Sequence, residues 1–199
     1  MKKLPLTLAS ASPRRLELLR QVGIEFRAHA TGIPEGIRES ESPQDSVLRL
    51  AEAKARSAAS SQSAQGVFMG ADTAVVLDRV VLGKPVDRGD ALRMLRLLAG
   101  RTHEVLTGLF ILRTDDGRSE GTVHSTRVRF RPFDDELVRW YVETGEPLDK
   151  AGAYGIQDRG ALLVDAIEGS WSNVVGLPLE RLPSLMAELG LDLLDYVRR

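Results

Sequence analysis

The segment LASASPRRLELL, residues 8 to 19, places two serines, a proline and two arginines where a helix is expected to begin. The N-terminus of a helix carries unpaired N–H groups and the positive end of the helix dipole. Arg14 and Arg15 are therefore unfavourable there unless an anion lies nearby, and Ser10 and Ser12 add hydroxyl donors. This combination predicts a phosphate-binding site. The alternative is a pair of solvated arginines beside an ordinary Ser-Pro cap.

Lys54 falls on the side of a predicted helix that should face the core, because it follows Leu50 and precedes Ala58 by four residues each. Lysines are rarely buried without a partner. The side chain either extends past the apolar surface to solvent or points at an anion inside a cleft.

Asp72 is the strongest candidate for chemistry, since it is the single carboxylate in the apolar run VFMGADTAVVL, residues 67 to 77. An unpaired buried carboxylate is costly, and strand ends are where α/β proteins expose catalytic groups. Asp72 is thus either a catalytic or metal-binding group or half of a structural salt bridge. Lys84, in the segment LGKP, could supply that bridge, and it could equally bind phosphate.

Several known phosphate-binding and metal-binding motifs are excluded by single residues. LGKP is not a P-loop, because Asp78 replaces the upstream glycine and Pro85 stands where Ser or Thr would bind magnesium. Ala74 occupies the place of the second carboxylate of aspartyl phosphatases. The chain has no cysteine and three widely separated histidines, so a zinc site is not expected.

The elements that must position these residues indicate an α/β fold with a mixed sheet, because strands and helices interleave without a strict βαβ rhythm. Residues 103–130 form two long strands around the turn TDDGR, the clearest hairpin signal in the chain. Ser12, Ser42 and Asp87 are predicted helix N-caps. The other predicted strands are 4–9, 24–31, 67–77, 80–82 and 161–167, and the predicted helices are 13–21, 43–59, 88–99, 133–145 and 179–189.

Composition limits the classes of protein that the chain can belong to. With 199 residues, 43% of them hydrophobic, it can form a single domain, residues 1–199, or two small lobes. The 27 basic and 28 acidic residues predict no general affinity for nucleic acid or for membrane surfaces. The absence of cysteine fits the cytoplasm. The start MKKLPLTLASAS is similar to a secretory signal, but its apolar stretch is too short, and no segment approaches the ~20 apolar residues of a membrane helix.

The motifs SASPRR, AEAKA, GADT, LGKP and DKAGAYGIQ, in this order and spacing, resemble those of the Maf family of nucleotide pyrophosphatases. The resemblance extends from Leu8 to about Pro178. GADT together with YGIQ is similar to the branch that acts on dTTP and UTP, rather than the branch that acts on 7-methyl-GTP. The resemblance implies an elongated mixed sheet with flanking helices and two lobes around a deep cleft, as in inosine triphosphate pyrophosphatases, and a homodimer.

The resemblance also implies roles for individual residues. Asp72 would be the catalytic base, and it would hold Mg²⁺ or Mn²⁺ together with Glu35 in TGIPEG. The residues expected to contact the substrate phosphates are Ser10, Ser12, Arg14, Arg15, Lys54 and Lys84. The residues expected to determine substrate choice are Arg14, Thr73 and Gln157. The family usually has Gly after GIQ, where this chain has Asp158, an extra carboxylate near the expected base pocket.

The expected reaction cleaves a nucleoside triphosphate between its α and β phosphates and gives a nucleoside monophosphate and pyrophosphate. Cations and the metal would neutralise the polyanion, while Asp72 would orient or deprotonate the attacking water. The amide of Gln157 offers one donor and one acceptor, which complement the N3–H and carbonyl edge shared by uracil and thymine. The alternative for Gln157 is a loop glutamine that bonds to backbone.

Two other functions remain open on the sequence alone. A regulatory nucleotide-binding protein linked to septum formation would need only the anion site, although Glu35 and Asp72 would then repel phosphate unless a metal intervened. An enzyme with the same chemistry that prefers modified or purine nucleotides is the nearer alternative. A nucleotide panel assayed for pyrophosphate separates all three.

Overall fold

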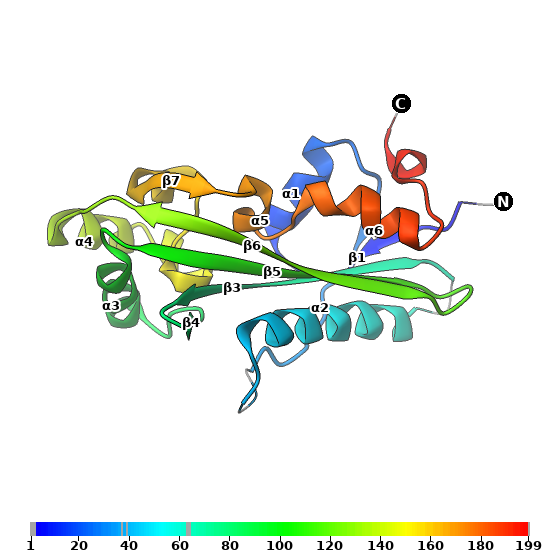
Figure 1. Ribbon diagram of the computed structural model, residues 1–199, viewed down its shortest axis with the longest axis horizontal. Coiled ribbons are helices and arrows are strands. Elements are labelled where there is room, and N and C mark those ends of the chain that lie inside the picture. Colours follow the sequence, from blue (N-terminus) through cyan, green and yellow to red (C-terminus); the bar gives the residue numbers. More distant parts are fainter. Residues whose placement is uncertain (1–2, 37, 39, 63–64, 199) are drawn as a thin grey trace. The chain divides into compact units, whose positions relative to one another are not determined.

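The computed structural model describes residues 3–36, 38, 40–62 and 65–198 (Figure 1). Within these residues seven strands form one sheet in the order β2-β1-β3-β5-β6-β7, with β4 paired to β3. β1 pairs in parallel with β2 and β3, whereas the β3/β4 and β6/β7 pairs are antiparallel. The strands are β1 (Leu6–Leu8), β2 (Arg27–Ala28), β3 (Val67–Leu77), β4 (Val80–Leu82), β5 (Thr102–Arg113), β6 (Ser119–Phe130) and β7 (Val164–Glu168). The predicted mixed α/β fold is confirmed.

The chain divides into two compact units. The first comprises Met1–Asp72, Thr107–His124 and Gly176–Arg199, and the second comprises Thr73–Leu106 and Ser125–Val175. The long strands β3, β5 and β6 each contribute residues to both units. Two compact units agree with the two lobes expected from the sequence, while the deep cleft and the single domain stay predictions.

Three α-helices cover the first unit: α1 (Pro13–Gln21), α2 (Pro43–Ser60) and α6 (Leu182–Glu188). α2 runs along one face of the sheet, as Figure 1 shows, and it begins as predicted, with the Ser42 side chain accepting the Asp45 N–H at 3.1 Å. The small side chains of Ala51 and Ala55 pack against Phe68 of β3 in the core. This small-residue face allows the helix backbone to approach the sheet closely.

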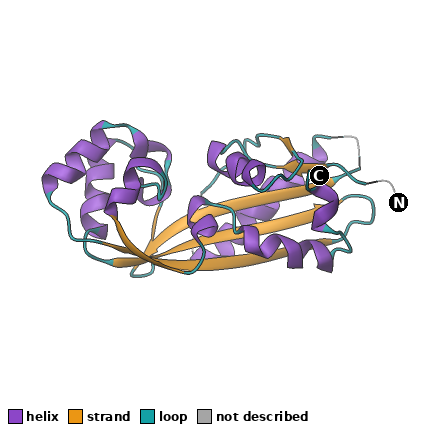
Figure 2. Ribbon diagram, turned by 90° about the horizontal axis from the view of Figure 1, so that it is seen from above, coloured by secondary structure: helices purple, strands orange, loops and turns teal. Residues whose placement is uncertain are grey.

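The second unit contains α3 (Arg88–Leu98), α4 (Asp135–Glu143) and the short α5 (Trp171–Val175). α3 packs against α4, and both helices lie at the left in Figures 1 and 2. Asp87 and Asp134 cap α3 and α4 by accepting the N–H groups of Asp90 and Leu137. Short 3₁₀ segments complete the described chain: Glu146–Asp149, Ala151–Ala153, Asp158–Leu163, Leu179–Arg181 and Leu193–Tyr196.

Three predicted elements differ most from the structure, while the strand expected over 4–9 and the helix expected over 133–145 are present but shorter, as Leu6–Leu8 and Asp135–Glu143. The strand expected over 24–31 is only Arg27–Ala28, because its partner β1 is itself only three residues long. The strand expected over 161–167 begins at Val164, since Asp158–Leu163 forms a 3₁₀ turn. The helix expected over 179–189 is divided, because α6 begins at Leu182 with Pro183, which lacks an N–H donor, in its first turn.

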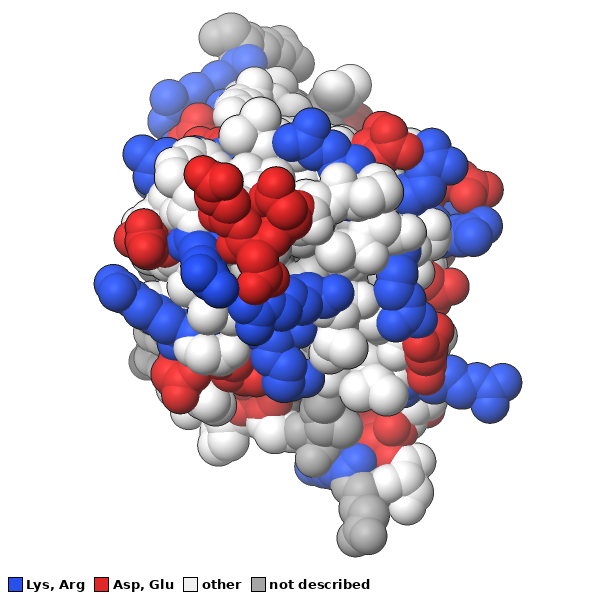
Figure 3. Space-filling model, turned by 90° about the vertical axis from the view of Figure 1, so that its left-hand side faces the viewer, with Lys and Arg blue, Asp and Glu red and all other residues white. Residues whose placement is uncertain are grey.

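Charged side chains of both signs are interspersed on the face drawn in Figure 3. In the second unit many of them form ion pairs, and the Arg96 guanidinium binds both carboxylate oxygens of Asp135 at 2.8 and 2.7 Å. Exposed pairs of this kind contribute little to stability. None of the helices in the described part of the chain combines the length and the apolar character needed to cross a bilayer.

Candidate active site

The Lys54 ammonium joins two carboxylates in the interior of the first unit. Its Nζ lies 2.6 Å from Oδ1 of Asp72 and 2.6 Å from Oε1 of Glu35. The side chains of Lys54 and Asp72 are 7% and 13% exposed, while that of Glu35 is 44% exposed. Lys54 therefore does not extend past the apolar surface to solvent; it points at anions, here two protein carboxylates. Asp72 forms a salt bridge with Lys54 in the structure. The sequence suggests Lys84 as a possible partner, because it is near Asp72 in the chain.

The approach of α2 to β3 brings Lys54 and Asp72 together. A Cβ atom at Gly70 would overlap the carbonyl oxygen of Ala51 and lie 2.9 Å from the amide nitrogen of Ala55. Asp72 follows Gly70 by two residues and so lies on the same face of the strand. Lys54, one turn along the helix from Ala51, then reaches the Asp72 carboxylate.

Asp72 lies in the middle of β3, where the strand changes its partner along one edge. The parallel pairing with β1 ends at Met69, and the antiparallel pairing with β4 begins at Val75. Asp72 therefore lies inside the predicted strand and not at its end, because β3 continues to Leu77. The carboxylate lies instead just beyond the carboxyl end of β1, the position at which open α/β sheets bind ligands.

The loop between β1 and α1 carries the predicted serines and arginines. At its start the loop stays bonded to β3, because the Ala9 N–H donates to the Met69 carbonyl at 2.7 Å. Ser10 is buried, and its Oγ accepts the Ser12 N–H at 3.1 Å. Ser12 has the predicted N-cap position, but its side chain makes no capping hydrogen bond.

Arg15 is buried, so the interpretation of two solvated arginines is wrong for this residue. Its Nε donates to the Gly176 carbonyl oxygen at 2.7 Å. Burial lowers the pKa of the Arg15 guanidinium, whereas the charges of Asp72 and Glu35 raise it and that of Arg14 lowers it. The charges of Arg14, Glu35 and Asp72 therefore all act on the Arg15 guanidinium.

An ion pair not anticipated from the sequence ties the segment after Glu35 to α2. Arg49 binds both carboxylate oxygens of Glu41, at 2.5 and 2.7 Å, and also donates to the Gly36 carbonyl at 3.1 Å. Hydrogen bonding to Arg49 lowers the pKa of Glu41 to about 2. Arg49 thus holds the chain next to Glu35, and no local sequence pattern distinguishes it from a surface arginine.

The other predicted residues, Thr73, Lys84 and Gln157, belong to the second unit. The Gly152 N–H donates to the Gly83 carbonyl at 3.0 Å, and a Cβ at Gly152 would lie 2.9 Å from the methyl groups of Val75. The motifs LGKP and AGAYGIQ therefore meet each other and β3 within this unit.

Gln157 is half-buried, and within the described residues no hydrogen bond involves its side chain. The alternative of a glutamine bonded to backbone is not observed there. Asp158 is exposed with φ of 53°, a left-handed conformation that glycine adopts without strain and that aspartate tolerates. This conformation explains why glycine suits the position.

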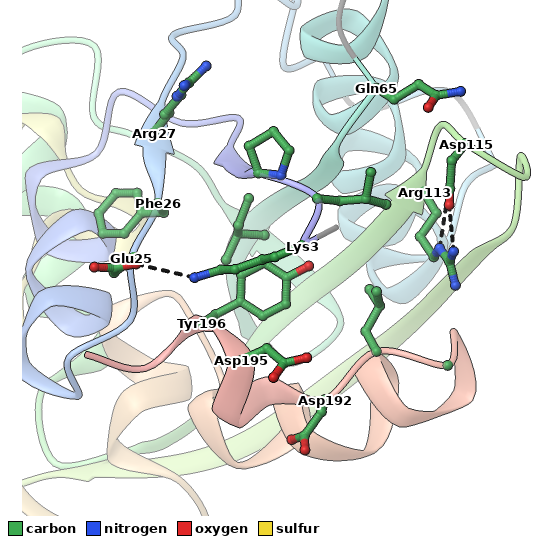
Figure 4. Close-up of a pocket in the computed structure, with 15 residues that line it drawn as sticks. Lys3, Glu25, Phe26, Arg27, Gln65, Arg113, Asp115, Asp192, Asp195 and Tyr196 are labelled. Atoms are coloured by element: carbon green, nitrogen blue, oxygen red, sulfur yellow. Dashed lines mark hydrogen bonds and ion pairs between the residues drawn. The ribbon is translucent and has the colours of Figure 1, made fainter. Parts of the chain in front are cut away.

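A cavity of about 1120 Å³ lies elsewhere in the first unit (Figure 4), beside the N-terminal end of β1. None of the predicted site residues lines it. Two of its cations are paired, Lys3 with Glu25 at 3.2 Å and Arg113 with Asp115 at 2.7 Å. The cavity is therefore not the candidate active site.

Comparison with known proteins agrees with the motifs. Residues 5–189 match the family model described as "Maf-like protein". Curated relatives include the dTTP/UTP pyrophosphatases of Symbiobacterium thermophilum, 51% identical over 93% of this chain and 94% of the relative, and of Moorella thermoacetica, 49% identical over 94% and 96%. The structure of a nucleoside-triphosphatase / dITP/XTP pyrophosphatase from Mycobacterium abscessus aligns with only part of this chain. The alignment covers 64% of this chain and 74% of that protein's chain, with 17% sequence identity and a TM-score of 0.39. On the sequence matches, the chain belongs to the family of Maf-like proteins.

Proposed function

We propose that this protein hydrolyses the nucleoside triphosphates dTTP and UTP to the monophosphates and pyrophosphate, and so removes them from the nucleotide pool. Relatives named dTTP/UTP pyrophosphatase are 49–51% identical to it over nearly the whole chain. The structural observation that carries the proposal is the buried Lys54 shared by Glu35 and Asp72, in the electrostatic environment of Arg15. A bare pair of carboxylates would repel a triphosphate, and these cations offset that repulsion.

The substrate phosphates would bind to Arg14, Arg15 and Lys84, with the hydroxyl groups of Ser10 and Ser12 as further donors. Arg15 suits this role because its contact with the Gly176 carbonyl fixes the guanidinium before substrate binds. In the structure Lys54 contacts the carboxylates. Its proposed contribution to phosphate binding is the positive charge that it adds between them.

Asp72 would be the general base. Its carboxylate is 13% exposed and is held by Lys54, so a water molecule could reach it while its orientation stays fixed. The water would give a proton to Asp72 as its oxygen attacks the α-phosphorus, and the bond from that phosphorus to the bridging oxygen would break. Pyrophosphate would then leave with its charge balanced by the arginines and lysines.

Glu35 and Asp72 are also the proposed ligands of Mg²⁺ or Mn²⁺. Their oxygens approach one ammonium group at 2.6 Å each, so both carboxylates already face a shared centre of positive charge. No group of three or more His, Asp or Glu side chains that could hold a metal occurs in the described parts of the chain. A two-carboxylate set fits Mg²⁺, which usually takes its remaining ligands from phosphates and water. The ion would supply charge neutralisation at the phosphate oxygens.

Base selection would depend on Gln157, with Arg14 and Thr73 as contributing residues. A primary amide presents one donor and one acceptor side by side, the complement of the N3–H and carbonyl edge of uracil and thymine. Within the described residues the Gln157 amide makes no competing hydrogen bond, which supports this role.

A nucleotide panel tests the proposal. The purified protein is incubated with dTTP, UTP, CTP, dCTP, ATP, GTP and their common modified forms, with Mg²⁺, Mn²⁺ or EDTA, and pyrophosphate and orthophosphate are measured. Metal-dependent release of pyrophosphate, fastest from dTTP and UTP, is the expected result. Nucleotide binding without release would favour the regulatory alternative. Faster release from purine or modified triphosphates would favour the alternative substrate class.

A cytoplasmic location and a homodimer are further proposals. The first is supported by the absence of cysteine in the sequence, which suits a reducing compartment, and the second by the family resemblance. Light scattering coupled to size-exclusion chromatography measures the molar mass directly. A mass near 21.8 kDa would contradict the homodimer.

A further inference from the structure

We propose that Tyr141 and Glu146 are positioning residues that clamp residues 155–160, and with them Gln157, in the conformation that selects the base. This inference rests on the proposed function. It assigns a role to two side chains that lie outside the predicted catalytic and phosphate-binding sets.

Tyr141 forms the first part of the clamp. It lies in the last turns of α4 and is completely buried. Its hydroxyl donates to Oε1 of Glu146 at 2.8 Å and accepts the Gly155 N–H at 3.1 Å. Burial, and to a smaller extent the Glu146 charge, raises the pKa of Tyr141, so the hydroxyl keeps its proton and remains a donor to the carboxylate.

Glu146 forms the second part of the clamp. Its Oε1 also accepts the Gly160 N–H at 3.1 Å, and its Oε2 accepts the Arg159 N–H at 3.3 Å. Together the two side chains bind three backbone N–H groups, of Gly155, Arg159 and Gly160. These groups flank Gln157 on both sides, so the segment is held at its two ends while Gln157 lies between them.

Residues 155–160 are also packed closely where the two ends of the segment meet. A Cβ atom at Gly160 would overlap the carbonyl oxygen of Gly155 and approach the Tyr141 hydroxyl at 2.6 Å. A Cβ at Gly155 would lie 2.8 Å from Cε of Lys150, whose Nζ donates to the Glu146 carbonyl at 2.6 Å. Gly160 therefore leaves no space for a side chain against the backbone of Gly155, whereas a methyl group at Gly155 would require the Lys150 side chain to move.

The polar nature of the clamp indicates a role in positioning. Glu146 is half-buried, and a carboxylate that is partly removed from water is costly unless hydrogen bonds satisfy it, as those from Tyr141, Arg159 and Gly160 do here. Charge-assisted bonds to backbone N–H groups fix both distance and direction. Selection between bases needs that fixed geometry, because the amide of Gln157 must present its donor and acceptor to matching atoms of the base.

Tyr141→Phe tests the clamp, with Tyr154→Phe as the matched control. Tyr154 is equally a buried tyrosine next to the segment, but its hydroxyl contacts His103 at 2.8 Å instead of the segment's backbone. Amide hydrogen exchange of Gly155 and the ratio of kcat/KM for UTP to that for CTP are measured in each variant. Tyr141→Phe should accelerate exchange at Gly155 and lower the UTP to CTP ratio about fivefold, the effect of one lost hydrogen bond. Tyr154→Phe should leave the ratio unchanged.

Glu146→Gln provides a second variant in case Tyr141→Phe folds poorly, because an amide cannot accept all the N–H groups that the carboxylate binds. It should accelerate exchange at Arg159 and Gly160 and lower the same ratio, whereas Glu146→Asp should restore part of it. A ratio equal to wild type in both clamp variants, or an equal fall in Tyr154→Phe, would overturn the proposal. If the wild-type protein releases no pyrophosphate from any triphosphate, the proposed function fails and base selection fails with it. The exchange rates would then still show whether the clamp holds the segment.

Discussion

Lys54 and Asp72 form an ion pair in the interior of the first unit, with Nζ and Oδ1 2.6 Å apart and neither side chain more than 13% exposed. The same ammonium group binds Glu35, which is 44% exposed. One lysine therefore balances two carboxylates of unequal accessibility. Removing the lysine and removing Asp72 should have different consequences, because the first leaves two charges uncompensated and the second leaves the lysine with Glu35.

Asp72→Asn should lower turnover by about 100-fold or more, the usual contribution of a general base. The amide is isosteric and Lys54 keeps Glu35 as a partner, so the fold and nucleotide binding should persist. Pyrophosphate release measures turnover, calorimetric titration measures binding and circular dichroism measures folding. Turnover near the wild-type rate would assign the role of base to another group.

Lys54→Met should destabilise the protein by about 2–3 kcal/mol. Breaking a fully buried ion pair costs about 3–5 kcal/mol, and the partial exposure of Glu35 reduces that cost. Urea denaturation measures the free energy of unfolding. Arg20→Met is the control, because the Arg20–Glu17 pair on α1 is 61% and 52% exposed and should contribute less than about 0.5 kcal/mol. Equal effects of the two variants would show that the buried pair does not stabilise the unit.

Gly70→Ala should force α2 away from β3 and weaken both stability and turnover. The new methyl group would overlap the Ala51 carbonyl, a backbone atom that cannot rotate away, and overpacking of this kind costs about 1–3 kcal/mol. Thermal denaturation and the pyrophosphate assay detect the two effects. Gly32→Ala is the control, since nothing lies within 4 Å of the position that its methyl group would take and no loss is expected. A Gly70→Ala protein as stable and active as wild type would contradict the close approach.

The stability of the protein should fall as the pH drops from about 6.5 towards 4 because of His103. This residue is 2% exposed, its Nε2 contacts the Tyr154 hydroxyl, and its Nδ1 has no hydrogen-bond partner among the described residues. Burial lowers the pKa of His103 to about 4. In this interval the unfolded chain binds a proton that the folded chain does not, so acid favours unfolding.

Between pH 7 and pH 5 this difference in proton binding corresponds to about 2 kcal/mol. Urea denaturation at several pH values measures it. His103→Gln can still bond to Tyr154 but does not titrate, so its stability should change less with pH than that of wild type. Parallel curves for the two proteins would exclude His103 as the source.

Gln157→Glu should impair the turnover of UTP and dTTP more than it impairs triphosphate binding in general. A carboxylate has no N–H donor, so one of the two hydrogen bonds to the pyrimidine edge is lost and a charge faces a carbonyl oxygen. Steady-state kinetics with UTP, dTTP and CTP, together with inhibition by inorganic triphosphate, separate the two effects. Equal losses with every base would remove Gln157 from base recognition.

The sequence predicts best where a local signal determines the structure. The helix expected at 13–21 and the strand expected at 67–77 match the structure residue for residue, because Ser12-Pro13 and a long apolar run are strong local signals. The predicted length of the strand at 24–31 is wrong, because that length depends on a partner strand elsewhere in the chain. α5 escaped prediction because its five residues are too few to show a helical period.

The candidate site residues also divide into those with a local sequence signal and those identified only by their contacts. Lys54 and Asp72 stand out in the sequence because each is a charge in an apolar pattern, but their pairing depends on how closely α2 approaches β3. Arg49 and Tyr141 have no such signal, since an arginine on a helix and an aromatic residue near a helix end are ordinary in any sequence. Their roles become visible only in their contacts, with Glu41 and with Gly155.

The contact of α2 with the sheet has a consequence for protein engineering. Gly70 and Gly108 face helix backbone so closely that a methyl group at either position would overlap a carbonyl, of Ala51 or of Val47. The distance between helix and sheet is thus determined by main-chain atoms. That distance in turn determines whether Lys54 can contact Asp72. A designer who wishes to retarget this enzyme scaffold should keep both glycines invariant and vary the loops, because a library built on the helix would change the ion pair before it changed the choice of ligand.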